Sequence, residues 1–498
     1  WAEHHPPSDT SARFRWREAA GYLHIPILQK LFYDFSNPGA LGILRIDEVL
    51  DWAAEALDRV DRASFFSTFE QSHAVQYFYE PFLEAFDPEL RKELGVWYTP
   101  PEIVHYMVER VDQVLRSELE IADGLADPRV VVLDPCCGTG AYLVEVLNRI
   151  AATLREKGDD ALLAHELKQA AMTRIYGFEI LPAPFVISHL QIGMLLHRLG
   201  APFADESAER AGVFLTNALT GWEPPTEPKQ HLLFPEMEEE RDKAQAVKQH
   251  APILVILGNP PYNGFAGVST EEEGSLLEPY KRGLADWGVT KNYLDDLYIR
   301  FFRVAERRIA ETGAVGVVSF ISNDSWTSGP SYVTARQHLL ESFDQFWLEN
   351  MHGDRTQTEY APDGRTSETV FALHGLSPGI RQGVVISLWV KTGRPYAQPR
   401  IGFRDDLNQA DASNRRAALV DSLDDARCWS HYVSVEPRAE SRYSFRPYVV
   451  HGRYSAWPAV PELAATDLLL GLNENRGGAL IDSDRDALIA RMRRYLDP

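Results

Sequence analysis

The segment VVVLDPCCGTGAYLVEVL, residues 130–147, constrains the fold of this chain more than any other. A run of apolar residues meets a glycine-containing turn, and an amphipathic helical pattern follows directly. A strand, a tight turn and a helix in that order open a pocket at the carboxyl end of the strand in doubly wound sheets. Gly138 and Gly140 lack a Cβ atom, so the backbone can turn sharply there and approach a ligand. The segment therefore predicts an α/β fold with a nucleotide-type pocket.

Alternating apolar runs and helical patterns extend this fold along the chain. Short apolar runs predict strands at residues 130–134, 174–180, 253–259 and 314–322. Longer helical patterns separate them at residues 141–158, 183–200 and 295–313. This alternation is typical of a parallel sheet with helices on both faces.

The length and the changes of pattern predict three parts. A chain of 498 residues corresponds to roughly three domains at about 150 residues each. Residues 1–95 carry helical patterns, with apolar residues at helical spacing over 46–57, and predict an all-helical domain. Residues 96–376 hold the alternating α/β pattern, and 377–498 read as a mixed C-terminal extension. Phe78, Phe82 and Phe86 recur every four residues and are interpreted as core packing.

The ligand of the glycine turn is not fixed by the turn alone. A dinucleotide fingerprint would have a third glycine, but Tyr142 and Leu143 follow Ala141, and a phosphate-binding loop would have a Lys-Ser or Lys-Thr pair. Glu179 ends the next predicted strand, where its carboxylate can accept both hydroxyls of a ribose. Asp134 closes the first strand and would lie beside an ammonium group or orient the glycine loop.

The most specific motif is Asn-Pro-Pro-Tyr, which follows the apolar run ILVILG directly. Pro260 and Pro261 fix the backbone and remove two amide donors, which leaves carbonyl groups free to accept hydrogen bonds. The Asn259 side-chain oxygen and the Pro260 carbonyl can each accept one N–H of a planar amino group, and Tyr262 can stack on a base. Such an element can hold the amino group for transfer of a methyl group. If the methyl group comes from a positively charged sulfonium, its transfer discharges a cation and needs neither a metal nor a strong general base.

The motifs LDPCCGTG, GFE and NPPY, in that order, resemble the amino-methyltransferases that act on adenine in DNA. The segment FYEPFLEAFDPELRKELGVWYTPPEIVHYMVERV is similar to the one before the methyltransferase core of type I-like single-polypeptide (ISP) restriction-modification enzymes. NYLDDLYIRFFRVAERRI, NMHGDRTQTE and RTSETVFAL resemble later blocks of that group. A stand-alone methyltransferase of a multi-component phage-defence system is the other relative that these motifs suggest.

The resemblance implies a Rossmann-like class I methyltransferase sheet that binds S-adenosylmethionine and methylates a flipped adenine in double-stranded DNA, protecting the host. It implies that Asn259, Pro260, Pro261 and Tyr262 are catalytic. The expected cofactor-binding residues lie before the glycine turn, within it, and after the next two strands: Tyr98, Thr99, Pro100, Asp134, Pro135, Gly138, Thr139, Gly140, Glu179, Ile180, Asn217 and Ala218.

Two features depart from the ISP group. The chain contains no Walker lysine loop, and residues 1–95 show no nuclease signature. The sequence also stops where a target-recognition region would begin, so other subunits or a recognition domain in further sequence are expected to complete DNA binding.

Charge and cysteine content limit the setting. The net charge of -22 repels a phosphate backbone at long range, so a DNA site must be a restricted basic surface or be completed by a partner. Only three cysteines and no long apolar run predict a cytoplasmic protein without membrane contact.

Three alternatives remain open. Asn-Pro-Pro-Tyr also suits methylation of adenine in RNA or of a glutamine amide in protein, because both offer a planar nitrogen. A non-catalytic subunit of a defence complex is a second alternative, and a dehydrogenase is a distant third.

Overall fold

A computed structural model describes most of the chain, and its contacts divide the chain into two units, Trp1–Pro447 and Tyr448–Pro498. The described residues are 12–22, 26–61, 99–158, 160–204, 209–223, 235–262, 273, 275–290, 293–356, 358–372, 379–394, 398–425, 428–448, 456–458 and 484–496.

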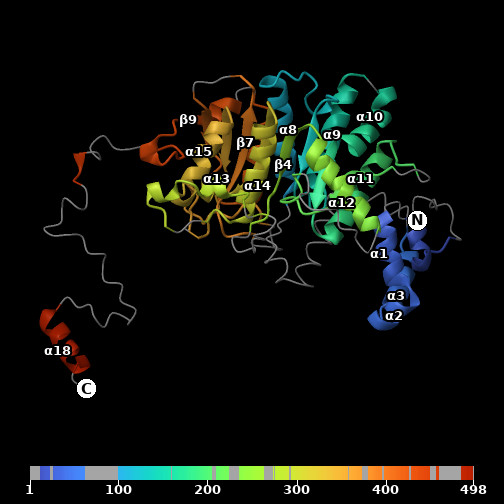
Figure 1. Ribbon diagram of the computed structural model, residues 1–498, viewed down its shortest axis with the longest axis horizontal. Helices are drawn as coiled ribbons and strands as arrows, with labels where there is room; N and C mark the ends of the chain where they lie inside the picture. Colours follow the sequence, from blue (N-terminus) through green and yellow to red (C-terminus); the bar gives the residue numbers. More distant parts are fainter. Residues whose placement is uncertain are drawn as a thin grey trace. The chain divides into compact units, whose positions relative to one another are not determined.

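One sheet of nine strands organises the first unit (Figure 1). Its strands lie in the order β3-β2-β1-β4-β5-β7-β6-β8-β9. Their bounds are β1 Val131–Asp134, β2 Ile175–Glu179, β3 Gly212–Leu215, β4 Ile253–Gly258, β5 Gly316–Asn323, β6 Gln345–Asn350, β7 Val384–Lys391, β8 Arg400–Arg404 and β9 Tyr432–Val435. The strands from β3 to β5 pair in parallel, so their carboxyl ends meet at one edge. The predicted Rossmann-like α/β fold is confirmed.

Strand β7 runs antiparallel between β5 and β6. Beyond β6, β8 pairs in parallel and β9 antiparallel. The predicted limit at residue 376 therefore falls between β6 and β7, within a single sheet.

Helices cover both faces of the sheet because successive strand residues point to opposite sides. Val132 packs into one core, whereas its neighbours Val131 and Leu133 pack into the other. The first core is closed by α8 Pro101–Ser117, α9 Ala141–Glu156, α10 Asp160–Thr173, α11 Pro182–Arg198 and α16 Ala412–Asp421. The second core is closed by α12 Pro235–His250, α13 Glu278–Lys281, α14 Leu297–Glu306 and α15 Val333–Ser342.

Short helical turns connect these elements. They are η3 Gly124–Ala126, η4 Leu284–Trp287, η5 Arg307–Thr312, η6 Asp324–Thr327, η7 Pro330–Tyr332, η8 Cys428–His431 and η9 Ala439–Ser441. The η5 segment is a π-helical continuation of α14 and ends at Gly313, where the sequence predicts the end of that helix.

The described N-terminal residues are helical, as predicted. They form η1 Trp16–Tyr22, α1 Pro26–Ser36, α2 Pro38–Leu44 and α3 Asp47–Asp58. In α3, Ala54 is buried and Leu50 packs beside it, but Val49 and Leu57 are exposed. Phe78, Phe82 and Phe86 lie outside the described residues.

The second unit contributes α18, Arg485–Leu496, to the described residues. Among the residues that the structure describes, no helix combines the length and apolar character needed to cross a bilayer.

Trp389 on β7 lies at the centre of the second core. It is fully buried, and its ring meets Phe302 at 4.8 Å and Phe343 at 5.4 Å between centroids. Its backbone neighbours in the sheet are Val318 on β5 and Phe346 on β6. This side chain therefore joins the antiparallel strand to helix α14.

We expect Trp389→Ala to lower the free energy of unfolding by about 3–5 kcal/mol, because it removes a large buried ring and leaves a cavity. Trp52→Ala is the matched control, since the Trp52 side chain is exposed on α3. Chemical denaturation measures both changes. Equal, small effects of the two substitutions would contradict the place of Trp389 in the core.

Candidate active site

The carboxyl ends of β2, β1 and β4 lie side by side, and each is followed by residues that the sequence singles out. β1 pairs with β2 on one side and with β4 on the other. Asp134 and Glu179 end β1 and β2, and Asn259 follows β4 directly. The order of the strands thus brings the predicted cofactor-binding residues Asp134 and Glu179 and the predicted catalytic residue Asn259 to one edge of the sheet.

The glycine turn between β1 and α9 uses both of its glycines, for different reasons. Gly140 has a φ of 89°, and a Cβ there would lie 3.0 Å from the Cβ of Ser188, so the residue permits close packing on α11. Gly138 has a φ of 53°, and a Cβ there would meet nothing within 4 Å. Gln191 on α11 donates from Nε2 to the Thr139 carbonyl at 2.7 Å. The turn is therefore held from α11 and leaves open space at Gly138.

Glu179 faces this turn and accepts three backbone N–H groups. Gly138 donates to Oε2 at 2.9 Å, and Ile180 and Leu181 donate to Oε1 at 2.9 and 2.7 Å. Burial raises the pKa of Glu179, whereas these backbone hydrogen bonds lower it. A carboxylate accepts about four hydrogen bonds, so one position stays open. Binding both hydroxyls of a ribose would require release of one of these three hydrogen bonds.

Asp134 is fully buried at the end of β1. Its Oδ1 accepts the Cys136 N–H at 3.1 Å, and its Oδ2 is buried with no hydrogen-bond partner among the described residues. Burial raises the pKa of Asp134 to about 8, and the charge of Glu179 adds to the rise. A Cβ on Gly258 would lie 2.6 Å from Oδ1, so the carboxylate depends on a glycine at the end of β4. A buried oxygen without a partner suits a cationic ammonium group.

The Asn-Pro-Pro-Tyr element is anchored at both ends. Asn259 donates from Nδ2 to the Thr99 hydroxyl at 3.0 Å, and with the amide in this direction Oδ1 is a hydrogen-bond acceptor. The ring of Tyr262 meets Phe371 edge-on, with 6.0 Å between centroids. The Tyr262 hydroxyl is buried, with no hydrogen-bond partner in the described part of the chain, and burial raises its pKa well above the ordinary value. This phenol is therefore neutral.

Lys248 on α12 holds the loop after β3, and the sequence did not single it out. Its Nζ donates to the Thr216 hydroxyl at 2.9 Å and to the carbonyls of Asn217 and Thr220 at 2.6 and 2.9 Å. The Thr216 N–H donates to the Glu179 carbonyl at 2.8 Å, which joins the loop to β2. Burial lowers the pKa of Lys248 to about 8. A single lysine in a charged helical pattern gives no signal of this contact.

The other predicted cofactor-binding residues are placed by the same elements. Thr99 and Pro100 are buried directly before α8, Pro135 is buried after β1, and Ile180 is exposed after β2. Asn217 Oδ1 accepts the Leu219 N–H at 2.9 Å, and Ala218 is buried. Tyr98 lies outside the described residues. The roles of the whole set stay predictions.

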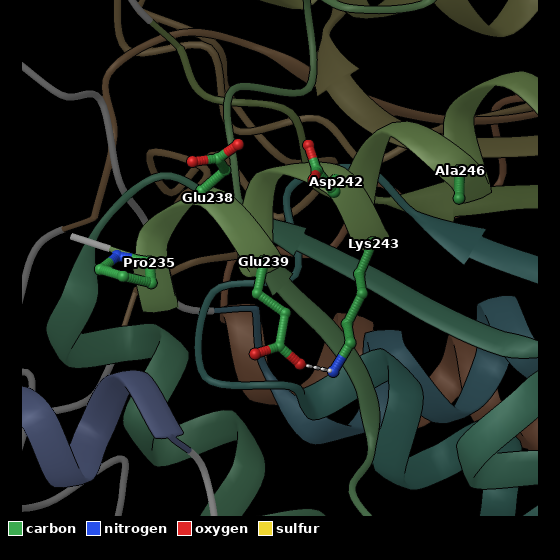
Figure 2. A pocket seen from close by; sticks show the side chains of 6 residues that line it. All are labelled: Pro235, Glu238, Glu239, Asp242, Lys243 and Ala246. Carbon is green, nitrogen blue, oxygen red and sulfur yellow. Dashed lines mark ion pairs between the residues drawn. The ribbon is translucent and has the colours of Figure 1, made fainter. Parts of the chain in front are cut away.

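A hollow of about 470 Å³ lies along α12, apart from these strand ends. Its lining includes Glu238, Glu239, Asp242 and Lys243, and Figure 2 shows the ion pair of 2.6 Å between Glu239 and Lys243. Three carboxylates against one ammonium repel a phosphate backbone.

Residues 70–322 match the model of the N-6 DNA methylase family. No curated protein sequence matches the chain.

Solved structures show the same fold. One is a cryo-EM structure of a DrdV–DNA complex, with 21% identity, a TM-score of 0.65, and coverage of 85% of this chain and 38% of that one. A second is the ATP-dependent Type ISP restriction-modification enzyme LlaBIII bound to DNA, with 20% identity, a TM-score of 0.66, and coverage of 89% and 29%. A third is a nuclease-deletion mutant of the Type ISP enzyme LlaGI with a DNA substrate mimic, with 20% identity, a TM-score of 0.59, and coverage of 86% and 33%. This chain thus spans well under half of each.

Replacing Asp134 by Asn should reveal the cost of burying its carboxyl group. The folded-state pKa of about 8 lies above the unfolded value, so the acid is protonated on folding and wild-type stability falls as the pH rises toward 8. An amide has no such dependence. We expect the melting temperature of Asp134→Asn to exceed that of the wild type by a margin that widens from pH 5 to pH 8.

Asp286→Asn is the matched control, because Asp286 is exposed. A margin for Asp134→Asn that stays constant across this pH range would contradict the raised pKa.

Proposed function

Since this chain belongs to the N-6 DNA methylase family, we propose that it transfers a methyl group from S-adenosylmethionine to the exocyclic 6-amino group of adenine in double-stranded DNA. The observation that carries the proposal is the adjacency of β1 and β4, which sets the buried Asp134 carboxylate against the residue before Asn259. The predicted cofactor-binding residues around Asp134, called the cofactor half, and the Asn-Pro-Pro-Tyr element, called the acceptor half, thereby share one edge of the sheet.

The residues of the cofactor half fit the methyl donor. Asp134 Oδ2 suits the ammonium of the methionine moiety, and the open space at Gly138 admits the ligand close to the backbone. Glu179 offers a carboxylate to the ribose, and the loop at Asn217 and Ala218 borders the adenine ring. When bound, the cofactor supplies a methyl group on a positive sulfonium.

The acceptor half prepares a weak nucleophile. The lone pair of the adenine amino group is delocalised into the ring. When the two N–H groups donate hydrogen bonds to Asn259 Oδ1 and the Pro260 carbonyl, a more tetrahedral nitrogen is favoured. Asn259 and Pro260 would hold this nitrogen with its lone pair toward the methyl group that the cofactor would supply. The extra proton on the methylated nitrogen would pass to solvent, so positioning and fixed dipoles carry the reaction.

Access to the amino group requires the adenine to leave the duplex, and the Tyr262 ring provides a face on which it can stack. The net charge of -22 leaves little long-range attraction for DNA. We infer that base readout and much of the phosphate contact come from other subunits or a recognition domain. The proposed setting is host protection in a restriction-modification or related phage-defence system.

The acidic charge favours a second candidate, methylation of adenine in RNA or of a glutamine amide in protein. Tritium-labelled S-adenosylmethionine, incubated with the chain and in turn with duplex DNA, RNA and a protein extract, separates these substrates. We expect label in DNA. Label in RNA or protein alone would reject DNA as the substrate.

Asn259→Ala tests the acceptor half. It removes the side-chain acceptor and the bond to Thr99, so we expect the rate of methyl transfer to fall by about 100-fold or more. The dissociation constant for S-adenosylmethionine, measured by calorimetry, should change far less than the rate, because Thr99 is, in the described part of the chain, the one predicted cofactor-binding residue to which Asn259 donates a side-chain hydrogen bond. Asn414→Ala, at an exposed position on α16, is the control. Undiminished transfer by Asn259→Ala would refute the assigned role.

Lys248→Met tests the loop at the adenine end of the cofactor. Loss of three hydrogen bonds frees the loop, and we expect cofactor affinity to fall by about tenfold, equivalent to ~1.4 kcal/mol. The turnover at saturating cofactor should change little, since the hydrogen bonds of Lys248 go to the loop after β3 and not to the Asn-Pro-Pro-Tyr element. Lys243→Met is the control on the same helix, because Lys243 is exposed and pairs with Glu239. Equal affinities of the two variants would exclude this role of Lys248.

A further inference from the structure

Helix α16 carries two adjacent arginines that are buried at the acceptor half of the site. Arg415 is fully buried, and the Arg416 residue is only 7% exposed. The helix packs against α8, whose N-terminus follows Thr99. Burying a guanidinium costs several kcal/mol unless its hydrogen bonds are well made, so the partners of these side chains indicate what the arrangement stabilises.

Arg416 forms hydrogen bonds with residues 370–372, the segment that contacts Tyr262. Its Nη1 donates to the carbonyls of Val370 and Ala372 at 2.8 and 3.2 Å. Phe371 lies between these two carbonyls, and its ring meets Tyr262 at an interplanar angle of 77°. The guanidinium thus fixes the backbone on both sides of the ring that Tyr262 packs against.

The same guanidinium also reaches the segment that supports Asn259. Arg416 Nε lies 3.4 Å from Glu102 Oε1, an ion pair with the first turn of α8. Thr99, three residues before Glu102, accepts the hydrogen bond from Asn259 Nδ2 at 3.0 Å. One side chain therefore connects to both ends of the Asn-Pro-Pro-Tyr element.

Arg415 fixes the base from which Arg416 extends. It donates to the carbonyls of Met351 and Glu368 at 2.8 and 2.7 Å, and to that of Leu407 at 3.0 Å. The N-terminus of α16 is tied to the same segment, because the Ala412 N–H donates to Glu368 Oε2 at 3.1 Å. Helix α16 is therefore fixed by hydrogen bonds to Met351, Glu368 and Leu407. These bonds also fix the backbone from which the Arg416 side chain extends.

We propose that Arg416 is a positioning residue that sets the distance and orientation between Asn259 and Tyr262. The inference rests on the proposed function, in which these two residues hold the amino group and the base. The described contacts of Arg416 reach the acceptor half and neither Asp134 nor Glu179. Of the predicted cofactor-binding residues that the structure describes, only Thr99 and Pro100 lie near its partner Glu102 in the sequence. Its loss therefore lowers turnover far more than cofactor affinity.

The kinetic test compares Arg416→Met with Arg365→Met, an exposed arginine that pairs with Asp363 and Asp411. For Arg416→Met, kcat with DNA falls by about 100-fold, as expected for a misplaced reacting group, and the S-adenosylmethionine dissociation constant changes by less than about twofold. Arg365→Met keeps both values. A wild-type kcat for Arg416→Met, or a parallel loss of kcat and cofactor affinity, overturns the inference.

Hydrogen exchange supplies a readout that does not depend on activity. In Arg416→Met, exchange accelerates together in residues 99–104 and 368–372, while residues 131–134 of β1 keep their protection. Glu102→Gln removes only the α8 contact, so it accelerates 99–104 alone. Uniform acceleration across all three segments means that Arg416 supports the fold as a whole, and no acceleration means that it holds neither segment; both overturn the inference.

The two tests also separate this inference from the proposed function. If the wild-type chain labels RNA or protein and not DNA, the proposed substrate fails, and the kinetic comparison is made on the substrate that is labelled. If the wild-type chain labels no substrate, the exchange pattern alone decides whether Arg416 holds the two segments.

Discussion

The contact between the Asp134 carboxylate and the backbone of Gly258 is the constraint on which the site depends. A Cβ at Gly258 would come within 2.6 Å of Asp134 Oδ1, so any larger residue there would displace the Asp134 side chain. The pairing of β1 with β4 sets the separation between the Asp134 carboxyl group and Asn259. Because strand positions in a packed sheet are stiff, the fold determines this distance before any ligand binds.

Each half is then organised mainly by hydrogen bonds to backbone groups. Three N–H groups converge on Glu179, and the carbonyls after β3 converge on Lys248. Burial disfavours the charged forms of Asp134 and Lys248, whose pKa values both shift to about 8 from opposite directions. The folded state thus bears an electrostatic cost at two buried groups beside the strand ends, a pattern found where function constrains stability.

The sequence predicts the first part of this arrangement well, for a physical reason. Strands β1, β2, β4 and β5 are buried on both faces and read as continuous apolar runs, and the motif residues follow directly from their ends. β3 and β9 have four residues each, as β1 does, but no glycine turn follows them to mark a strand end. The position of β7 between β5 and β6 depends on pairing over long sequence distances. Lys248 and Arg416 act through contacts 28 or more residues away, which no local pattern encodes.

The two buried cations approach the site from opposite faces of the sheet. Helix α12, which carries Lys248, closes one core, whereas α8 and α16, which connect through Arg416, close the other. Strands β1 and β4 contribute side chains to both cores. In the proposed function, Lys248 therefore supports the loop after β3 from one face and Arg416 supports the Asn-Pro-Pro-Tyr element from the other, with the sheet as the element that they share.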